Sequence, residues 1–490
     1  MGLRNKAIIG IRWIAFQQAG TRLMSLAVLV VLARLLEPAA FGVVALATAA
    51  TAFLQSFVAG GFAAAIVQRK EVEREHLDTA FWINVGVAFI AITVLWAVSE
   101  PLARSFKEPE LAPVLRWMSL LLIIRALNQV QVALLKRKLK FKSLAIRQLI
   151  GDPIGGVAGV AMAVMGFGVW SLVARELVTA LVRLLVLWGT APWRPGLHVS
   201  MRHFNELFSF GASMLGTSLA GFFRKRSADL IIGYFLGSAA LGYFTIANRF
   251  FRMIRRVVSG TLGSVMWPVY ARLQEDKERL RRAFEFSLRV MCFLTIPVFV
   301  GLASLAGEIV PTVFGEKWFP AVPVMQVLAI LGFLNAVMGL NSSLIIALGK
   351  PHWHLSVQIV VSVLSVVGFL VVVDQGIVAV AGWYVLANVL VFPISIWMAK
   401  KLAAIDAAVF ARAAVVPAIS AVAMAGAIYV NRLWMADGVG SGAQLIMLGV
   451  VGAAVYIVGV SMLSPSFLKE VKRLIIEAGS VRGAIKSAAK

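Results

Sequence analysis

The chain is dominated by apolar runs that recur along its whole length, each long enough to cross a lipid bilayer. A helix needs about 20 mainly apolar residues to cross the hydrocarbon core. Backbone N–H and C=O groups find no partners in lipid, so a spanning run must satisfy them within its own helix. The chain is 60% hydrophobic and only 14% charged, whereas soluble domains are about 25% charged. The sequence therefore predicts an all-α, polytopic membrane protein.

Counting these runs predicts about 14 transmembrane helices, with about 12 as the smaller alternative. The expected spans are 10–33, 41–66, 81–99, 113–135, 144–165, 169–189, 205–236, 241–268, 286–306, 322–347, 354–373, 377–398, 413–430 and 443–463. We expect a lobe of about six helices over 1–200, a second over 201–400 and an extra helix pair over 401–465. Residues 466–490 are expected to form a cytoplasmic amphipathic tail, because apolar residues recur there at helical spacing with basic residues on other faces.

A segment near the start of the chain recurs about 200 positions later. Aligning Val31–Ala49 with Ile231–Arg249 pairs Leu36 with Leu236, Ala39 with Ala239, Gly42 with Gly242 and Ala47 with Ala247. Farther along, Phe106 and Glu108 are echoed by Phe314 and Glu316. An even number of spans, about six, separates the copies, so both lobes face the same way. We therefore expect a pseudo-twofold axis along the membrane normal, as in transporters built from parallel repeats.

Basic residues outside the spans predict the orientation of the chain. If the N-terminus lies in the cytoplasm, about 27 Lys and Arg fall in inner segments and about 5 in outer loops. Cytoplasmic loops carry an excess of Lys and Arg, so both termini are expected in the cytoplasm. The cluster Lys136, Arg137, Lys138, Lys140 and Lys142 is part of this signal and a candidate contact for anionic membrane lipids.

Several other classes of function are disfavoured. The net charge is +24, but the basic residues interrupt apolar runs and form no soluble basic domain, so we expect no nucleic-acid partner. The single cysteine, Cys292, can form neither an intrachain disulfide nor a thiolate metal site. The five histidines are scattered, only His352 and His354 being close in sequence, so no metal or other cofactor is expected. No nucleophile-elbow, zinc-protease or P-loop motif occurs, so the chain is not expected to be an enzyme.

The expected spans contain many cations. About 15 Lys and Arg lie within or at the edges of spans, and each would cost roughly 2.5–3.5 kcal/mol facing lipid at mid-bilayer. The carboxylates that could pair with them are fewer: Asp152, Glu176, Glu206, Asp229 and Glu308. The surplus cations must reach the interface or face water inside the protein. This surplus predicts a cationic, water-filled lumen.

Helical spacing indicates which polar residues share a face of their helix. Arg249, Arg252 and Arg256 are spaced i, i+3, i+7 and form one stripe through the middle of the membrane. The residues expected to bind substrate are Gln18, Arg22, Arg125, Asn128, Arg224, Arg226, Asn248, Arg249, Arg252 and Arg256. Glu176 and Asp229 are candidates for an ion-coupling site.

Other charged and small residues in the spans are expected to be structural. Cations near expected helix ends can extend to the interface; these are Arg12, Arg116, Arg147, Arg183 and Arg289. The neighbours Arg175 and Glu176 point to different faces, so each is expected to pair with another helix. Gly155, Gly156 and Gly159 in the fifth span are expected to allow close helix packing or bending.

A cationic lumen selects cargo by charge. Arginine guanidinium groups bind phosphate and carboxylate oxygens in pairs, so the cargo should be anionic. The amides of Gln18, Asn128, Gln129 and Asn248 suit sugar hydroxyls. We therefore expect the polar head group of a lipid to pass through the lumen while its tail stays in the bilayer.

Several segments resemble a known family. They are LARLLEPAAFG at 32–42, LKRKLKF at 135–141, IIGYFLG at 231–237, GYFTIANR at 242–249 and FGEKW at 314–318. Over most of residues 1–400, the chain resembles the polysaccharide-unit flippases of the multidrug/oligosaccharidyl-lipid/polysaccharide exporter superfamily, in the branch that serves lipopolysaccharide and exopolysaccharide biosynthesis.

This resemblance implies a bacterial inner-membrane protein that moves undecaprenyl-pyrophosphate-linked oligosaccharide by alternating access. Its expected partners are the lipid-linked oligosaccharide and membrane lipids, with a polysaccharide polymerase and glycosyltransferases as candidate protein partners. The superfamily also contains flippases of the peptidoglycan precursor lipid, and Arg22 and Arg249 resemble basic residues in the first and eighth spans of those relatives. The last two spans resemble the extra pair that lines a lipid-tail groove there.

Alternative functions remain open at this point. A drug/cation antiporter of the same superfamily would need acidic residues in its lumen, whereas the expected interior is cationic. A membrane glycosyltransferase or ligase would need a sizeable extramembrane loop, and the connections between the expected spans are short. A non-transporting scaffold would leave the intramembrane arginines unexplained.

Overall fold

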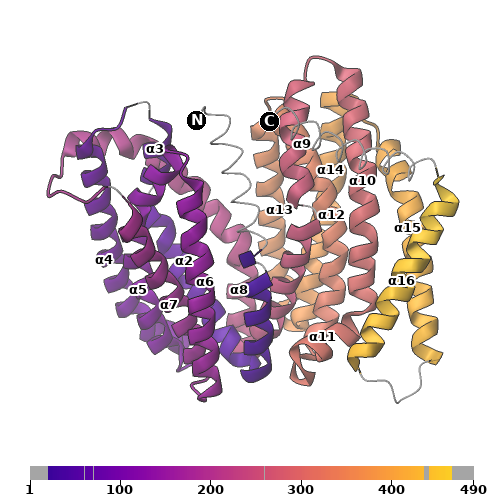
Figure 1. Cartoon of the computed structure of the whole chain (residues 1–490), viewed down its shortest axis with the longest axis horizontal. Helices are drawn as coiled ribbons and strands as arrows, with labels where there is room; N and C mark the ends of the chain where they lie inside the picture. Colours follow the sequence, from indigo (N-terminus) through magenta and orange to yellow (C-terminus); the bar gives the residue numbers. More distant parts are fainter. Residues whose placement is uncertain are drawn as a thin grey trace, which may run out of the picture. The chain divides into compact units, whose positions relative to one another are not determined.

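The computed structural model of the chain is built from helices (Figure 1). It describes residues 20–465 apart from 22, 60, 70, 192, 259 and 435–440. Gln18, Arg22 and the expected tail 466–490 lie outside the described residues. Within the described part no strand occurs, so the predicted all-α class is confirmed.

The helices follow the expected spans closely. After a first apolar helix, Leu23–Leu35, come α2 (Pro38–Ala59), α3 (Phe62–Gln68), α4 (Arg74–Ser105), α5 (Leu111–Arg137), α6 (Phe141–Val164), α7 (Val169–Thr190) and α8 (Met201–Val258). The chain continues through α9 (Gly260–Arg272), α10 (Lys277–Ser304), α11 (Ala306–Phe314), η1 (Glu316–Trp318), α12 (Ala321–Ala347), α13 (Pro351–Val372), η2 (Val373–Gln375), α14 (Ile377–Ala403), α15 (Ala407–Trp434) and α16 (Ser441–Leu463).

Among the described residues, 10 helices are long and apolar enough to cross a membrane. Two further helices, α6 and α7, fall outside this set although they are 24 and 22 residues long. Both carry charged residues along their length, among them Asp152 in α6 and Glu176 in α7. The long α8 is kinked at Gly237, which has φ 84° and ψ 177°, at the boundary between two expected spans. A polytopic membrane fold is therefore confirmed.

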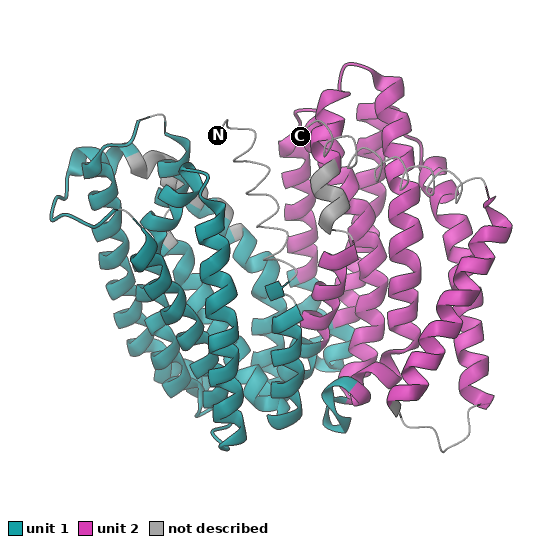
Figure 2. Ribbon diagram, viewed as in Figure 1, with its two compact units in different colours: residues 1–246, 313–318, 366–380 teal, residues 247–312, 319–365, 381–490 magenta. Residues whose placement is uncertain are grey.

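Contacts divide the chain into two compact units (Figure 2). Unit 1 contains Met1–Ile246, Val313–Trp318 and Val366–Val380; unit 2 contains Ala247–Thr312, Phe319–Ser365 and Ala381–Lys490. The expected division into lobes over 1–200 and 201–400, followed by a pair over 401–465, stays a prediction.

In unit 1, α4 and α5 pack against each other in antiparallel orientation. Polar contacts join the two helices at one end, and apolar side chains join them at the other end. Arg116 donates from Nε to Ser99 Oγ at 3.0 Å and from Nη2 to Glu100 Oε1 at 2.9 Å. Trp96 Nε1 donates to Ser119 Oγ at 3.0 Å. Arg116 is thus held between two helices, in agreement with its expected structural role.

The two copies of the internal repeat meet inside unit 1 at reciprocal glycines. A Cβ on Gly42 would lie 1.8 Å from the backbone oxygen of Ser238, and one on Gly242 would lie 2.0 Å from that of Pro38. Because positions 38 and 238, like 42 and 242, correspond in the repeat, each copy places its glycine against the other's helix start. Only glycine permits so close an approach of two backbones.

The second part of the repeat packs beside this crossing. Glu108 Oε1 accepts from the backbone N–H of Ser238 at 3.3 Å. In the corresponding segment of the second copy, Trp318 is fully buried, and its indole Nε1 donates to the Ala33 carbonyl at 2.8 Å. Arg34 Nε donates to the Val313 carbonyl at 3.0 Å. The FGEKW segment at 314–318 is therefore a structural element that holds the first helices of unit 1.

In unit 2, the last helix pair packs against α10 and α11. Tyr456 of α16 donates from its hydroxyl to the Phe293 carbonyl at 2.8 Å. Arg432 of α15 forms an ion pair with Glu308 of α11, with 2.7 Å between Nε and Oε1. These contacts pair Glu308, one of the few carboxylates in the apolar segments, with an arginine of another helix.

Candidate functional site

A pocket of about 690 Å³ opens within unit 1 between α3, α5, α6 and α7. Its size falls in the usual range of small-molecule sites, about 300–1,000 Å³. Its polar lining consists of Gln68, Arg125, Asn128, Gln129, Lys136, Arg147, Glu176, Thr179 and Arg183. Alanine, valine, leucine and isoleucine side chains form the remaining wall.

Helical periodicity brings these residues to one place. On α5, Arg125, Asn128, Gln129 and Lys136 stand at i, i+3, i+4 and i+11, so they follow one face over several turns. On α7, Glu176, Thr179 and Arg183 stand at i, i+3 and i+7, again on one face. Arg147 completes the lining from α6.

Glycines of α6 let α7 approach closely enough to form the pocket wall. A Cβ at Gly151 would lie 2.5 Å from Cγ of Arg183, and one at Gly155 would lie 1.9 Å from Oγ1 of Thr179. A Cβ at Gly159 would lie 2.8 Å from Cβ of Arg175. The glycines recur at every fourth position, as in the small-xxx-small pattern of packed membrane helices. The expected close packing at Gly155 and Gly159 is confirmed.

The pocket carries more positive than negative charge. Arg125, Lys136, Arg147 and Arg183 face it, with Glu176 as the carboxylate of its lining. Arg183 also forms an ion pair with Asp152. The charges of Glu176, Arg183 and Arg226 all act on the Arg125 guanidinium. The balance leaves a positive potential in a largely apolar setting, where electrostatic attraction is strong.

Several hydrogen-bonding groups at the pocket have no protein partner among the described residues. The Nε groups of Arg147 and Arg183 are buried without an acceptor, and Oδ1 of Asn128 is buried without a donor. Buried polar groups are normally paired, and each exception calls for a reason. A bound anionic or hydroxylated ligand would supply the missing partners.

A smaller cavity of about 110 Å³ shares part of this lining. Glu176, Thr179 and Arg183 line both cavities, and the smaller one also contacts Ser25 of the first helix and Asp152. Ser25 comes three residues after Arg22 and seven after Gln18 in the sequence, and both of these residues lie outside the described residues.

The structure brings together some of the residues expected to bind substrate or couple an ion. Arg125, Asn128 and Glu176 line one pocket. Arg147 and Arg183 line it too, although their places near expected helix ends suggested structural roles. In the sequence, these two residues were indicated only by the number of charged residues in the fifth and sixth expected spans. The same charged residues keep α6 and α7 out of the set of helices that are long and apolar enough to cross a membrane.

Other expected residues lie elsewhere. On α8 in unit 1, Arg226 Nη1 forms an ion pair with Asp229 Oδ2 at 2.9 Å, while Arg224 is exposed. In unit 2, Asn248, Arg249, Arg252 and Arg256 lie on the unbroken helix that follows Gly237, so the predicted stripe of Arg249, Arg252 and Arg256 agrees with the observed helix. Arg256 is exposed, and Asn248, Arg249 and Arg252 are half-buried.

This fold is that of a class of membrane transporters. The chain aligns with a lipid II flippase, MurJ, in an inward closed conformation, with a TM-score of 0.77 and 13% identity, covering 94% of this chain and 100% of that one. It also aligns with an inward-facing multidrug resistance MATE family transporter of the MOP superfamily, with a TM-score of 0.61 and 17% identity, covering 79% and 95%. At such low identity the likeness establishes the fold alone.

The sequence establishes the family. Residues 31–323 match the family described as polysaccharide biosynthesis protein, so the chain belongs to that family. A succinoglycan biosynthesis transport protein, ExoT of Rhizobium meliloti, is 33% identical over 318 residues, which are 65% of this chain and 64% of that protein. The lipopolysaccharide biosynthesis protein WzxC of Escherichia coli is 28% identical over 353 residues, 71% of each. The resemblance to polysaccharide-unit flippases is confirmed.

Proposed function

We propose that this multi-pass membrane protein is a flippase for lipid-linked oligosaccharide in polysaccharide biosynthesis. In this proposal it carries an oligosaccharide on undecaprenyl pyrophosphate across the bacterial cytoplasmic membrane by alternating access. Family membership, the transporter fold and the named relatives support it. Both termini lie in the cytoplasm in this proposal, and the protein carries out transport rather than catalysis.

The observation that carries the proposal is the cationic pocket of unit 1. Arg125, Arg147 and Arg183 offer guanidinium groups to one pocket, and two of their Nε donors are buried without a partner among the described residues. Paired guanidinium donors match the oxygens of a pyrophosphate. The amides of Asn128 and Gln129, both about one helical turn after Arg125 on α5, suit the first sugar.

The other residues expected to bind substrate stay a separate part of the proposal. They are proposed to contact the anionic head group too: Gln18, Arg22, Arg224, Arg226, Asn248, Arg249, Arg252 and Arg256. Glu176 is the better candidate for ion coupling, because it faces the pocket, whereas Asp229 is already paired with Arg226.

The antiporter alternative is less well supported by the same pocket. A lumen that binds cationic drugs needs a negative potential, but Arg125, Lys136, Arg147 and Arg183 outnumber Glu176 in the lining. An anionic cargo fits this balance of charges.

The experiment is a translocation assay in proteoliposomes that contain a pyrophosphate-linked oligosaccharide lipid. Arg125→Ala and Arg147→Ala, which lose donors to the head group, should each slow translocation by about 10- to 100-fold. Arg104→Ala is a matched control, because Arg104 is exposed near the end of α4 and lies outside the pocket lining. Full translocation by both pocket variants would contradict the proposed site.

A further inference from the structure

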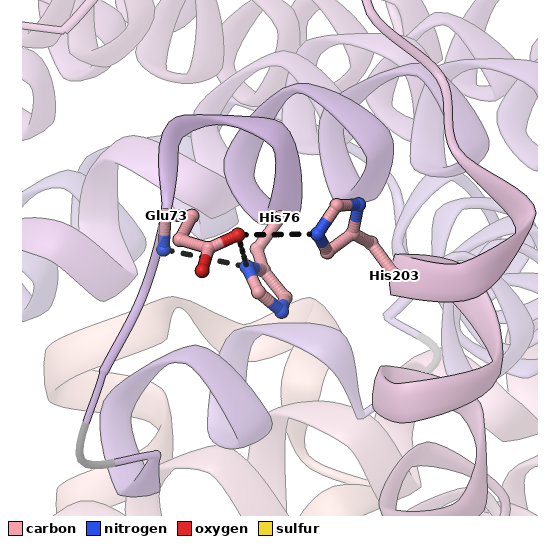
Figure 3. A group of neighbouring side chains, drawn as sticks. All are labelled: Glu73, His76 and His203. Atoms are coloured by element: carbon pink, nitrogen blue, oxygen red, sulfur yellow. Dashed lines mark hydrogen bonds and ion pairs between the residues drawn. The ribbon is translucent and has the colours of Figure 1, made fainter.

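Two histidines that are far apart in sequence meet a carboxylate at the start of α4 and α8 (Figure 3). Glu73 and His76 belong to the first turn of α4, and His203 belongs to the first turn of α8. Oε2 of Glu73 lies 3.3 Å from Nε2 of His203 and 3.9 Å from Nδ1 of His76. One ligand atom from each residue lies within 4.8 Å of the other two.

The helix start explains how Glu73 and His76 come to face each other. Glu73 is the N-cap of α4 and forms a capping box with His76. Nδ1 of His76 accepts from the backbone N–H of Glu73 at 3.3 Å, which fixes this nitrogen as the one without a proton. In this state the capping hydrogen bond occupies the lone pair of Nδ1, so a metal ion bound to Nδ1 would take the place of the Glu73 N–H donor.

The other nitrogen of His76 has the partner that a metal-bound histidine usually has. Nε2 lies 3.1 Å from Oε2 of Glu206, to which it donates in this tautomer. Glu206 is itself held by ion pairs with Arg69 and with Arg202, the latter at 3.2 Å. A carboxylate that accepts from the far nitrogen orients the imidazole and raises its basicity as a ligand.

The three side chains differ in how far each is exposed to water. His76 and His203 are largely enclosed, with 4% and 14% of their side chains exposed, whereas Glu73 is 66% exposed. The two imidazoles therefore form a fixed pair beneath a carboxylate that water can reach. Oε2 of Glu73 already lies 3.3 Å from Nε2 of His203, which is about the spacing between two ligands of a zinc ion, and the exposed carboxylate can shift to shorten its distance of 3.9 Å from Nδ1 of His76.

We propose that Glu73, His76 and His203 form a binding site for Zn²⁺, with a fourth position open to water. Two imidazoles and one carboxylate are a ligand set that zinc uses. The sequence alone does not predict this site, because His76 and His203 lie on different helices and only the fold joins them. A bound ion would tie the start of α4 to the start of α8.

The test is zinc binding by the full-length protein, purified in detergent without a polyhistidine tag. Affinity is measured by competition with a chromophoric chelator, and the melting temperature is measured with and without Zn²⁺. The natural protein should bind one zinc ion and melt at a higher temperature when zinc is present, because the ion binds the folded state. His203→Ala and Glu73→Gln should weaken binding by at least about 10- to 100-fold and remove the thermal shift.

The control is His352→Ala, which removes an exposed histidine of α13 in unit 2. It should keep both the affinity and the thermal shift. Glu73→Gln retains an oxygen that can cap α4, so a loss of binding by this variant reports the ligand rather than the fold. The proposal is overturned if the natural protein binds no zinc, or if His203→Ala or Glu73→Gln binds zinc as tightly as the natural protein does.

Discussion

Arginine donors give the pocket of unit 1 its chemical character. Arg125 is exposed although it lies near the middle of α5, a helix whose neighbouring residues Ala126 and Val130 are fully buried. An exposed guanidinium in an apolar helix is expensive to keep unless water or a ligand reaches it. Its place in the pocket lining therefore favours a role in binding.

The first prediction separates charge from geometry at this residue. Arg125→Lys keeps a point charge but loses the planar pair of donors, so translocation should fall less than in Arg125→Ala. Arg125→Glu should be the most damaging, because it reverses the charge. The same order is expected at 249, 252 and 256. Initial rates in proteoliposomes, normalised to reconstituted protein, provide the comparison; equal rates for the three Arg125 variants would count against electrostatic binding.

A second prediction concerns Arg226, whose role differs from that of Arg125. Asp229 is only 6% exposed and is paired with Arg226, so Arg226→Ala leaves a carboxylate buried without its partner. Breaking a buried pair in this way costs roughly 3–5 kcal/mol. Membrane abundance and detergent melting temperature should fall in Arg226→Ala and recover when Asp229→Asn is added.

Arg125→Ala is the reference for that experiment. It removes an exposed guanidinium, and Glu176, the carboxylate whose charge acts on it, lines an open pocket, so the abundance and melting temperature of Arg125→Ala should stay near those of the natural protein. If the double variant at 226 and 229 were as unstable as Arg226→Ala alone, the ion pair would not explain the loss.

At the scale of helices, glycines stand where neighbouring helices of unit 1 approach each other closely. Gly42 and Gly242 join the two copies of the repeat, and Gly151, Gly155 and Gly159 hold α6 against α7. Each glycine lies where a Cβ would overlap atoms of a neighbouring helix. The positions of these helices therefore depend on residues that have no side chain.

The third prediction tests the crossing of the repeat. Gly42→Ala and Gly242→Ala would place a methyl group 1.8 Å and 2.0 Å from backbone oxygens, so the two helix starts must separate. We expect a loss of about 1–3 kcal/mol in stability, measured as a lower melting temperature in detergent. Gly86→Ala on α4, where nothing lies within 4 Å of the added Cβ, should melt at the same or a slightly higher temperature. Unchanged melting of both crossing variants would refute the close contact.

The helices themselves could be predicted well from the sequence. Apolar runs of bilayer length have few alternatives, because lipid leaves a backbone no partner outside its own helix. The kink at Gly237 falls between the expected spans 205–236 and 241–268, and the repeat predicted which segments correspond.

The candidate site could be predicted only in part. Spacing along a helix indicated that Arg125 and Asn128 share a face, and both line the pocket. Arg147 and Arg183 were missed because distance from a helix end gives depth in the membrane but not the neighbouring helix. That neighbour is set by the glycines of α6, and the meeting of His76 with His203 depends in the same way on packing between distant segments.

For the whole molecule, the distribution of basic residues predicts the topology. The fourth prediction is that Lys138, in the turn between α5 and α6, faces the cytoplasm. Lys138→Cys should resist an impermeant thiol reagent added to intact cells and react once the cells are opened. The natural Cys292 is buried, so it should contribute little background labelling. Labelling of Lys138→Cys in intact cells would reverse the proposed orientation.

The central claim is that the protein moves an anionic, lipid-linked oligosaccharide across the membrane. The most direct measurement compares the natural protein in proteoliposomes on two cargoes with the same sugar and lipid, one with a pyrophosphate linkage and one with an uncharged linkage. An impermeant reagent that modifies the sugar reports how much cargo reaches the opposite leaflet. The account predicts rapid translocation of the pyrophosphate-linked lipid, and rates near those of protein-free vesicles for the uncharged one. Equal translocation of both lipids, or no movement of the pyrophosphate-linked lipid above protein-free vesicles, would contradict it.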